Sequence, residues 1–225
     1  MADIYKVFDN IYENKKWGNR KETLSGGGST KEINKFRIPF LKKFIEDYKI
    51  TNIYDICGDC AWQEDLVPPE SNKNIRYYGF DVSKIALEKA KETNKMNTNM
   101  IFSEGPLNLC DTILECNNGN KSLIIIKEVM QHLPLLMGLQ MLKNIKKSGI
   151  KYIAITNFDQ DIYDKTKLLY PKNLNVEIGG YYTNNMFMFP FEFKNPIANV
   201  NDTMNIHYLR MYGNLIIFDI QEQSI

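Results

Sequence analysis

The chain has 225 residues, 44% of them hydrophobic, which is enough for one domain with a substantial core. Its net charge of +1 gives no overall attraction to nucleic acid, so we expect no large nucleic-acid partner. No apolar run reaches the ~20 residues of a membrane helix, and the first residues lack the apolar core of a signal peptide. We therefore expect a cytoplasmic protein without membrane insertion, as a monomer or small homo-oligomer.

Residues 1–48 are expected to form a helical lid with a glycine-rich loop. Near the N-terminus, aromatic residues recur every three to five positions, as in an amphipathic helix: Tyr5, Phe8, Tyr12 and Trp17. Residues 25–29, Ser-Gly-Gly-Gly-Ser, are either a flexible linker or a loop whose amides approach a charged ligand closely. Ser29 or Thr30 would cap the next helix, in which Pro39 predicts a kink or break.

The rest of the chain alternates between predicted strands and helices. Five apolar runs are predicted strands: residues 52–56, 75–80, 99–103, 122–127 and 152–156. Helices are predicted over residues 83–95, capped by Ser83, and over residues 133–145, opened by Pro134. Two last strands, over residues 205–211 and 213–220, would form a hairpin. We predict a single α/β domain over residues 1–225. It has a Rossmann-like, seven-stranded, mostly parallel sheet with an antiparallel C-terminal hairpin and helices on both faces.

Residues 159–196 break this alternation. The segment contains no strong helix pattern and is rich in Tyr, Asn, Met and Phe. Loops of this length without regular structure are uncommon unless they have a function. We therefore interpret this segment as an insertion at the acceptor site.

The turn after the first strand is the strongest functional signal. Asp55 lies near the strand end, Gly58 and Asp59 follow, and Asp81 ends the second strand 23 residues after Gly58. A strand, a glycine turn, a helix and a strand ending in an acid are typical of folds that bind a nucleoside-bearing cofactor. Cys57 and Cys60 have the C-x-x-C spacing of a redox or zinc pair, but we favour a packing role and expect no metal.

Further motifs follow one another in a recognisable order. They are Trp17-Gly18, the Ser-Gly-Gly-Gly-Ser of residues 25–29, Asp55-Ile-Cys-Gly-Asp-Cys-Ala-Trp62, Tyr78-Gly-Phe-Asp81, Val129-Met-Gln-His-Leu133, Ser148-Gly-Ile-Lys-Tyr152 and Pro190-Phe191. This series resembles class I S-adenosylmethionine (SAM)-dependent methyltransferases, and in particular a bacterial and viral branch associated with glycan-building functions. The resemblance covers essentially the whole chain.

The resemblance implies a set of cofactor-binding residues: Trp17, Ser25, Gly26, Ser29, Asp55, Cys57, Gly58, Asp59, Trp62, Asp81, Val82, Glu104, Gly105 and Lys127. Gly58 would pass close to the methionine part of SAM, and Asp55 would orient the turn or meet the ammonium group. Asp81 would accept hydrogen bonds from the ribose, although it could instead be a charge at a helix N-terminus, and Val82 would pack on the adenine. Relatives usually carry an acid shortly after the third strand, where this chain has Pro106. Either Glu104 substitutes for that acid, or backbone groups hold the adenine.

The fourth strand delivers the candidate catalytic residues. We expect His132 to be a general base for methyl transfer to a hydroxyl, with Glu128 orienting it from one helical turn away. The alternative is that His132 caps or packs the following helix, while His207 is interpreted as structural. The resemblance favours O-methylation of a sugar or glycan. Methylation of RNA or another small molecule, or an inactive cofactor-binding scaffold, are alternatives; a dinucleotide oxidoreductase is less favoured because the Gly-x-Gly-x-x-Gly spacing is missing.

Overall fold

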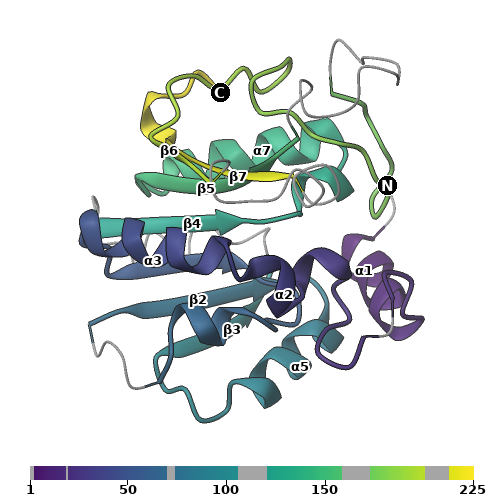
Figure 1. Cartoon of the computed structure of the whole chain (residues 1–225). Helices are drawn as coiled ribbons and strands as arrows, with labels where there is room; N and C mark the ends of the chain where they lie inside the picture. Colours follow the sequence, from purple (N-terminus) through teal and green to yellow (C-terminus); the bar gives the residue numbers. More distant parts are fainter. Residues whose placement is uncertain (1–2, 19, 70–73, 106–120, 159–172, 201–212) are drawn as a thin grey trace.

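A computed structural model describes residues 3–18, 20–69, 74–105, 121–158, 173–200 and 213–225. Within them, one seven-stranded sheet runs in the order β3-β2-β1-β4-β5-β7-β6 (Figure 1). Its strands are β1 (Asn52–Ile56), β2 (Arg76–Asp81), β3 (Met100–Glu104), β4 (Ser122–Ile126), β5 (Tyr152–Asn157), β6 (Ala198–Asn199) and β7 (Asn214–Asp219). Strands β1 to β5 are parallel, and β7 is antiparallel to both β5 and β6. The predicted fold class is confirmed.

The end of the sheet differs in detail from the prediction. The predicted strand over residues 205–211 lies outside the described residues, as does His207. The described partner of β7 on that side is β6, which pairs Ala198 with Ile217 and Asn199 with Ile216. The antiparallel C-terminal strands are therefore present, but the described pair is not joined by the tight turn that was predicted around residue 213.

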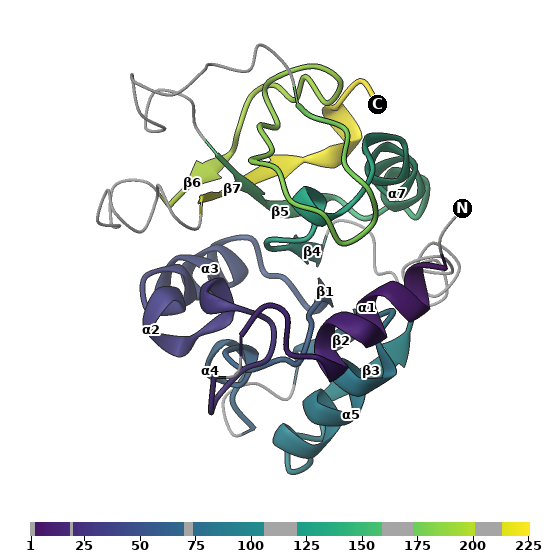
Figure 2. The same ribbon diagram turned by 90° about the vertical axis from the view of Figure 1, so that its right-hand side faces the viewer.

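Helices cover both faces of the sheet, as Figure 2 shows. Helices α2 (Lys31–Asn34), α3 (Arg37–Asp47) and α4 (Gln63–Leu66) lie on one side, and α1 (Ile4–Glu13) and α7 (Leu135–Lys147) lie on the other. Strand β4 supplies both cores, because Leu123 and Ile125 face the α3 side while Ile124 and Ile126 face the α7 side. All four side chains are 0% exposed, which explains the continuous apolar run of this strand.

Local sequence signals set the helix boundaries. Ser83 caps α5 (Lys84–Thr93) by accepting a hydrogen bond from the amide of Ala86, and Thr30 caps α2 in the same way through Ile33. Pro134 precedes α7, as predicted. The break predicted at Pro39 falls earlier, before Arg37, so Pro39 lies in the first turn of α3, where its missing N–H costs little.

One end of the sheet is covered by a helix and two 3₁₀ turns. The carboxyl ends of β1, β2 and β4 lie beside α1, the 3₁₀ turn η1 (Gly27–Ser29) and the 3₁₀ turn η3 (Met130–His132). In open α/β sheets this is the end where ligands bind. Among the described residues, no helix is both long and apolar enough to cross a membrane.

Candidate functional site

A cavity opens at the carboxyl ends of β1, β2 and β4. The space between its walls amounts to about 800 Å³, including the part that is open to solvent. Most of the predicted site residues line it: Trp17, Ser25, Ser29, Asp55, Cys57, Gly58, Trp62, Asp81, Val82, Lys127, Glu128 and His132. The fold thus brings most of the predicted cofactor residues and both candidate catalytic residues to one cavity.

Four predicted cofactor residues do not line the cavity: Gly26, Asp59, Glu104 and Gly105. Glu104 is exposed at the end of β3, and whether it takes the place of the missing acid stays a prediction. Gly105 instead donates its N–H to the carbonyl of Asp81 at 2.9 Å. Residues 106–120 follow directly and lie outside the described residues. Pro106, which stands where relatives carry the acid, is one of them.

Asp59 fixes the glycine loop instead of facing the cavity. Its Oδ1 accepts hydrogen bonds from the hydroxyls of Thr23 at 2.8 Å and Ser25 at 2.6 Å, and its Oδ2 accepts one from the amide of Leu24 at 2.7 Å. The Tyr12 and Ser25 hydroxyls are 2.8 Å apart, which ties α1 to the same loop. The segment before the glycines is therefore held in place, unlike a plain linker.

Gly58 is required by the close approach of this loop. Its φ is +57°, and a Cβ added to it would lie 2.5 Å from the Ser25 hydroxyl and 2.9 Å from the Tyr12 hydroxyl. Any side chain at this position would push the loop and α1 off the turn, because contacts this short are not tolerated.

Asp55 lies at the base of the cavity, 1% exposed. Its Oδ2 accepts hydrogen bonds from the Tyr77 hydroxyl at 2.8 Å and the Gln63 amide at 3.0 Å, while its Oδ1 has no partner in the described part of the chain. Burial raises the pKa of Asp55 to about 7, against the opposing effects of Gln63, Tyr77 and the charge of Lys127. A cationic donor from a ligand would satisfy the second oxygen.

Asp81 lies at the adjacent strand end. Its Oδ1 accepts a hydrogen bond from the amide of Ser83 at 2.7 Å, and burial raises its pKa to about 7, opposed by the backbone N–H groups of Ser83 and Gly58. The carboxylate therefore does interact with the start of α5, as expected for a charge at a helix N-terminus. It also lines the cavity next to Val82, where hydroxyl donors of a ligand could reach it.

Cys57 and Cys60 pack the turn. Both thiols are buried and reduced; the Cys57 thiol donates to the carbonyl of Gly58 at 3.4 Å, and Cys60 Sγ lies 3.7 Å from the Tyr77 hydroxyl. The described residues contain no group of three or more potential metal ligands. Cys110 and Cys116 lie outside the described part of the chain.

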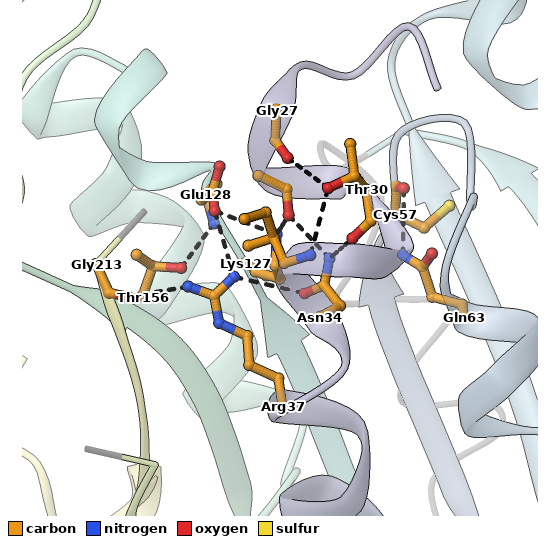
Figure 3. A network of polar contacts seen from close by, with 12 residues as sticks. Gly27, Thr30, Asn34, Arg37, Cys57, Gln63, Lys127, Glu128, Thr156 and Gly213 are labelled. Carbon is orange, nitrogen blue, oxygen red and sulfur yellow. Dashed lines mark hydrogen bonds and ion pairs between the residues drawn. The ribbon is translucent and has the colours of Figure 1, made fainter. Parts of the chain in front are cut away.

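A buried network links the glycine loop to β4 (Figure 3). Lys127 Nζ donates to the Gly28 carbonyl at 2.8 Å and to Glu128 Oε1 at 3.2 Å. Arg37, 0% exposed, places Nη1 at 3.5 Å from Glu128 Oε1 and donates from Nη2 to the carbonyl of Gly213 at 2.9 Å. Burial lowers the pKa of Lys127 to about 8, with the charge of Glu128 opposing the shift. The network holds the glycine loop against the strand end.

The predicted hydrogen-bonded pair of Glu128 and His132 is not formed. Glu128 has a φ of +56° and is followed by a 3₁₀ turn, so the two residues are not on one face of an α-helix, and the carboxylate is bound by Arg37 and Lys127. His132 Nδ1 lies 2.7 Å from the carbonyl of Gly180 instead. Burial lowers the pKa of His132, and this carbonyl and the charge of Glu128 oppose the shift without reversing it.

Aromatic rings flank His132. The centroid of its ring lies 4.7 Å from that of Trp17 and 5.8 Å from that of Tyr181, which is 54% exposed. Hydrogen bonds from the amides of Gly179 and Tyr182 to the carbonyls of His132 and Gln131 fix this part of the predicted acceptor segment beside η3. The described part of the segment, residues 173–196, contains no helix or strand, and residues 159–172 lie outside the described part.

Comparison with solved structures identifies the architecture. A SAM-dependent methyltransferase from Anabaena variabilis ATCC 29413 superposes with a TM-score of 0.61 at 14% identity, over 97% of this chain and 96% of that chain. Magnesium protoporphyrin IX methyltransferase (ChlM) from Synechocystis PCC 6803, solved with S-adenosylhomocysteine (SAH), gives 0.56 at 11% identity over 95% of each chain. This chain has the SAM-dependent methyltransferase fold.

A third structure with this fold is the N-terminal domain of EvdMO1, solved with SAH and D-fucose. It superposes with a TM-score of 0.53 at 11% identity over 97% of each chain. No protein-family model matches the sequence of this chain, and no curated protein matches it. At these identities the likeness is one of fold, and residue roles must come from the site itself.

Sequence reasoning missed several residues of this methyltransferase-fold cavity: Ile4, Phe8, Tyr12, Ile56, Gln63, Val129, Leu133 and Met141. The apolar residues close the cavity from α1, the end of β1, α7 and the two residues that flank η3, and the aromatic spacing of α1 was the signal for Phe8 and Tyr12. Gln63 directly follows the Asp-Ile-Cys-Gly-Asp-Cys-Ala-Trp motif of residues 55–62 and could have been included with it. Arg37 gave no signal, since it looks like an ordinary charged residue of an amphipathic helix.

Proposed function

We propose that this protein is a SAM-dependent O-methyltransferase that acts on a sugar or glycan hydroxyl. The observation that carries the cofactor assignment is the unpartnered Oδ1 of Asp55, buried at the base of the cavity in this fold. SAM, when bound, supplies a methyl group on a sulfonium. Its ammonium would donate a hydrogen bond to Oδ1 of Asp55, its ribose hydroxyls would donate to Asp81, and Val82 would pack on the adenine.

The chain would then orient the acceptor and take up its proton. The carbonyl of Gly180 can only accept a hydrogen bond, so a neutral His132 carries its proton on Nδ1 and has its lone pair on Nε2. Burial favours this neutral form at pH 7. Nε2 would receive the proton of the acceptor hydroxyl as the methyl group is transferred. Trp17, whose ring lies tilted against the imidazole, would keep water from this position.

The acceptor assignment is supported by the aromatic residues beside His132. Tyr181 presents an exposed ring next to the imidazole, and aromatic rings stack on the apolar faces of sugars. EvdMO1, which shares the fold, was solved with D-fucose. Glu128, held by Arg37 and Lys127, would accept a hydrogen bond from the acceptor or the cofactor instead of orienting His132.

Two measurements test this proposal. Calorimetric titration with SAM, SAH and NAD should show binding of the first two, and tighter binding of NAD would refute the cofactor assignment. Transfer of labelled methyl from SAM to a panel of methyl glycosides and nucleotide sugars should reveal an acceptor. His132→Gln should then lower kcat by at least about 100-fold with an unchanged SAM affinity. Cofactor binding without transfer to any acceptor would favour an inactive scaffold.

A further inference from the structure

The two oxygens of the Asp55 carboxylate have unlike surroundings. Oδ2 accepts two hydrogen bonds, from the Tyr77 hydroxyl and the Gln63 side-chain amide, whereas Oδ1 accepts none from the described residues. A buried carboxylate oxygen without a donor is costly, and in native proteins such groups are usually satisfied by a partner or a ligand. The cavity lies directly beside Asp55.

Gln63 and Tyr77 are themselves held in place. Gln63, 2% exposed, accepts the amide of Trp62 on Oε1 at 3.2 Å, and its Nε2 also reaches the carbonyl of Cys57 at 3.4 Å (Figure 3). Tyr77 is 0% exposed in β2, with Cys60 Sγ 3.7 Å from its hydroxyl. Two anchored donors on Oδ2 fix the orientation of the carboxylate and leave Oδ1 as the oxygen without a donor.

None of the described residues that line the cavity donates to Oδ1. Lys127 is the one lysine or arginine among the described lining residues, and its Nζ donates to the Gly28 carbonyl and to Glu128. Its charge acts on Asp55 without a hydrogen bond. The position in front of Oδ1 therefore suits a cationic donor from outside the chain.

We propose that Gln63 and Tyr77 are positioning residues that reserve one oxygen of Asp55 for the ammonium group of an amino-acid-bearing ligand. The inference rests on the proposed function, since the methionine end of SAM carries such an ammonium. It predicts that the site distinguishes ligands by this group. SAH has the ammonium, whereas 5′-methylthioadenosine shares the adenosine and the thioether but lacks the amino acid.

The test compares these two ligands by calorimetry in four proteins. Tyr77→Phe and Gln63→Met each remove one donor to Asp55 and keep the side-chain bulk, and each should weaken SAH binding about tenfold or more. Binding of 5′-methylthioadenosine should stay within about twofold, because it makes no contact through Asp55. Tyr78→Phe is the matched control: Tyr78 stacks on Tyr54 at 5.1 Å, away from Asp55, and its substitution should change neither ligand.

The pH profile gives a second readout. SAH binding favours the ionised form of Asp55, so its affinity should rise with pH through the titration of this group. Tyr77 donates to the carboxylate and favours its charged form, so Tyr77→Phe should move the midpoint to higher pH. The other titratable groups facing Asp55 are Lys127, directly after β4, and Cys57 on the turn, and both remain in the variant.

The outcomes separate the two claims. If the wild-type protein binds neither SAM nor SAH, the proposed function fails, and this inference fails with it. If SAH binds, but the variants lose both ligands equally or keep both with an unmoved pH midpoint, Gln63 and Tyr77 are merely structural and the inference is overturned. Should one variant fail to fold by circular dichroism, the other decides.

Discussion

Gly28 allows a direct test of how the glycine loop is held. A Cβ built on Gly28 would lie 1.8 Å from Glu128 Oε2 and 2.2 Å from its carboxyl carbon. Normal contacts begin at about 3.5 Å, so Gly28→Ala must displace the carboxylate by more than about 1 Å. Glu128 would then lose its ion pairs with Lys127 and with Arg37, whose side chain is 0% exposed.

The expected cost follows from the buried ion pair. Breaking such a pair typically costs about 3–5 kcal/mol. Arg37 keeps its hydrogen bond to the Gly213 carbonyl, and Glu128 is 16% exposed and can move toward the cavity. We therefore expect a loss near the lower limit, about 3 kcal/mol, which for a chain of this size lowers Tm by about 6–12 °C.

A double-mutant cycle identifies the cause. Glu128→Ala alone should cost about as much as Gly28→Ala, because it also leaves Arg37 without its anion. In the Glu128→Ala background, Gly28→Ala should cost almost nothing, since the new methyl group occupies vacated space, so the coupling energy is about 2–3 kcal/mol. Chemical denaturation of the four proteins measures it.

Additive effects in this cycle would refute the reasoning, because they would mean that Gly28 and Glu128 act independently. Gly138→Ala is the control. Gly138 lies inside α7, where a new Cβ would meet the flexible end of the Met130 side chain at 2.8 Å. Since alanine is favoured over glycine in a helix by about 1 kcal/mol, this variant should be neutral or more stable.

Three further predictions concern the two buried carboxylates. Asp55 and Asp81 have pKa values of about 7 in the folded protein, whereas an aspartate in the unfolded chain releases its proton near pH 4. Between these pH values the native state therefore holds protons that the unfolded chain has lost. Without cofactor, the free energy of unfolding should fall as pH rises through 7, by at most about 4 kcal/mol for each group. Urea denaturation at pH 5 to 8 measures this slope, and Asp55→Asn should reduce it. SAM should raise Tm more at pH 8 than at pH 6, because the ammonium favours ionised Asp55; an equal gain at both values would contradict its role. Asp81→Asn should weaken both SAH and 5′-methylthioadenosine in calorimetry, because both carry the ribose, and selective loss of SAH would argue against this placement.

The strands and caps could be predicted because their signals are local. Apolar runs bounded by turn residues located β1 to β5 within one or two residues, and Ser83 marked the start of α5. The set of residues around the cavity was also largely predictable, because the carboxyl ends of adjacent parallel strands meet at one edge of the sheet.

The contacts within the site could not be predicted in the same way. The pairing of Glu128 with His132 assumed an α-helix, whereas the left-handed backbone at Glu128 turns its side chain toward Arg37. Arg37 itself bonds to Gly213, 176 residues away, and no local pattern indicates such a partner. The carbonyl of Gly180 that holds His132 likewise comes from an irregular segment 48 residues later.

The cavity is assembled from two parts of the chain that contribute different things. Residues 12–82 supply Asp55, Gly58, Asp81 and the glycine loop, while the imidazole and the exposed Tyr181 come from residues after β4. Residues 179–182 are attached to η3 through their own backbone groups: the amides of Gly179 and Tyr182 donate to backbone carbonyls, and the Gly180 carbonyl is bound to the His132 ring. The exposed side chains of that segment can therefore vary without disturbing its attachment. The proposed function therefore predicts that exchanging this segment between proteins of the same fold changes the acceptor and leaves SAM binding unchanged.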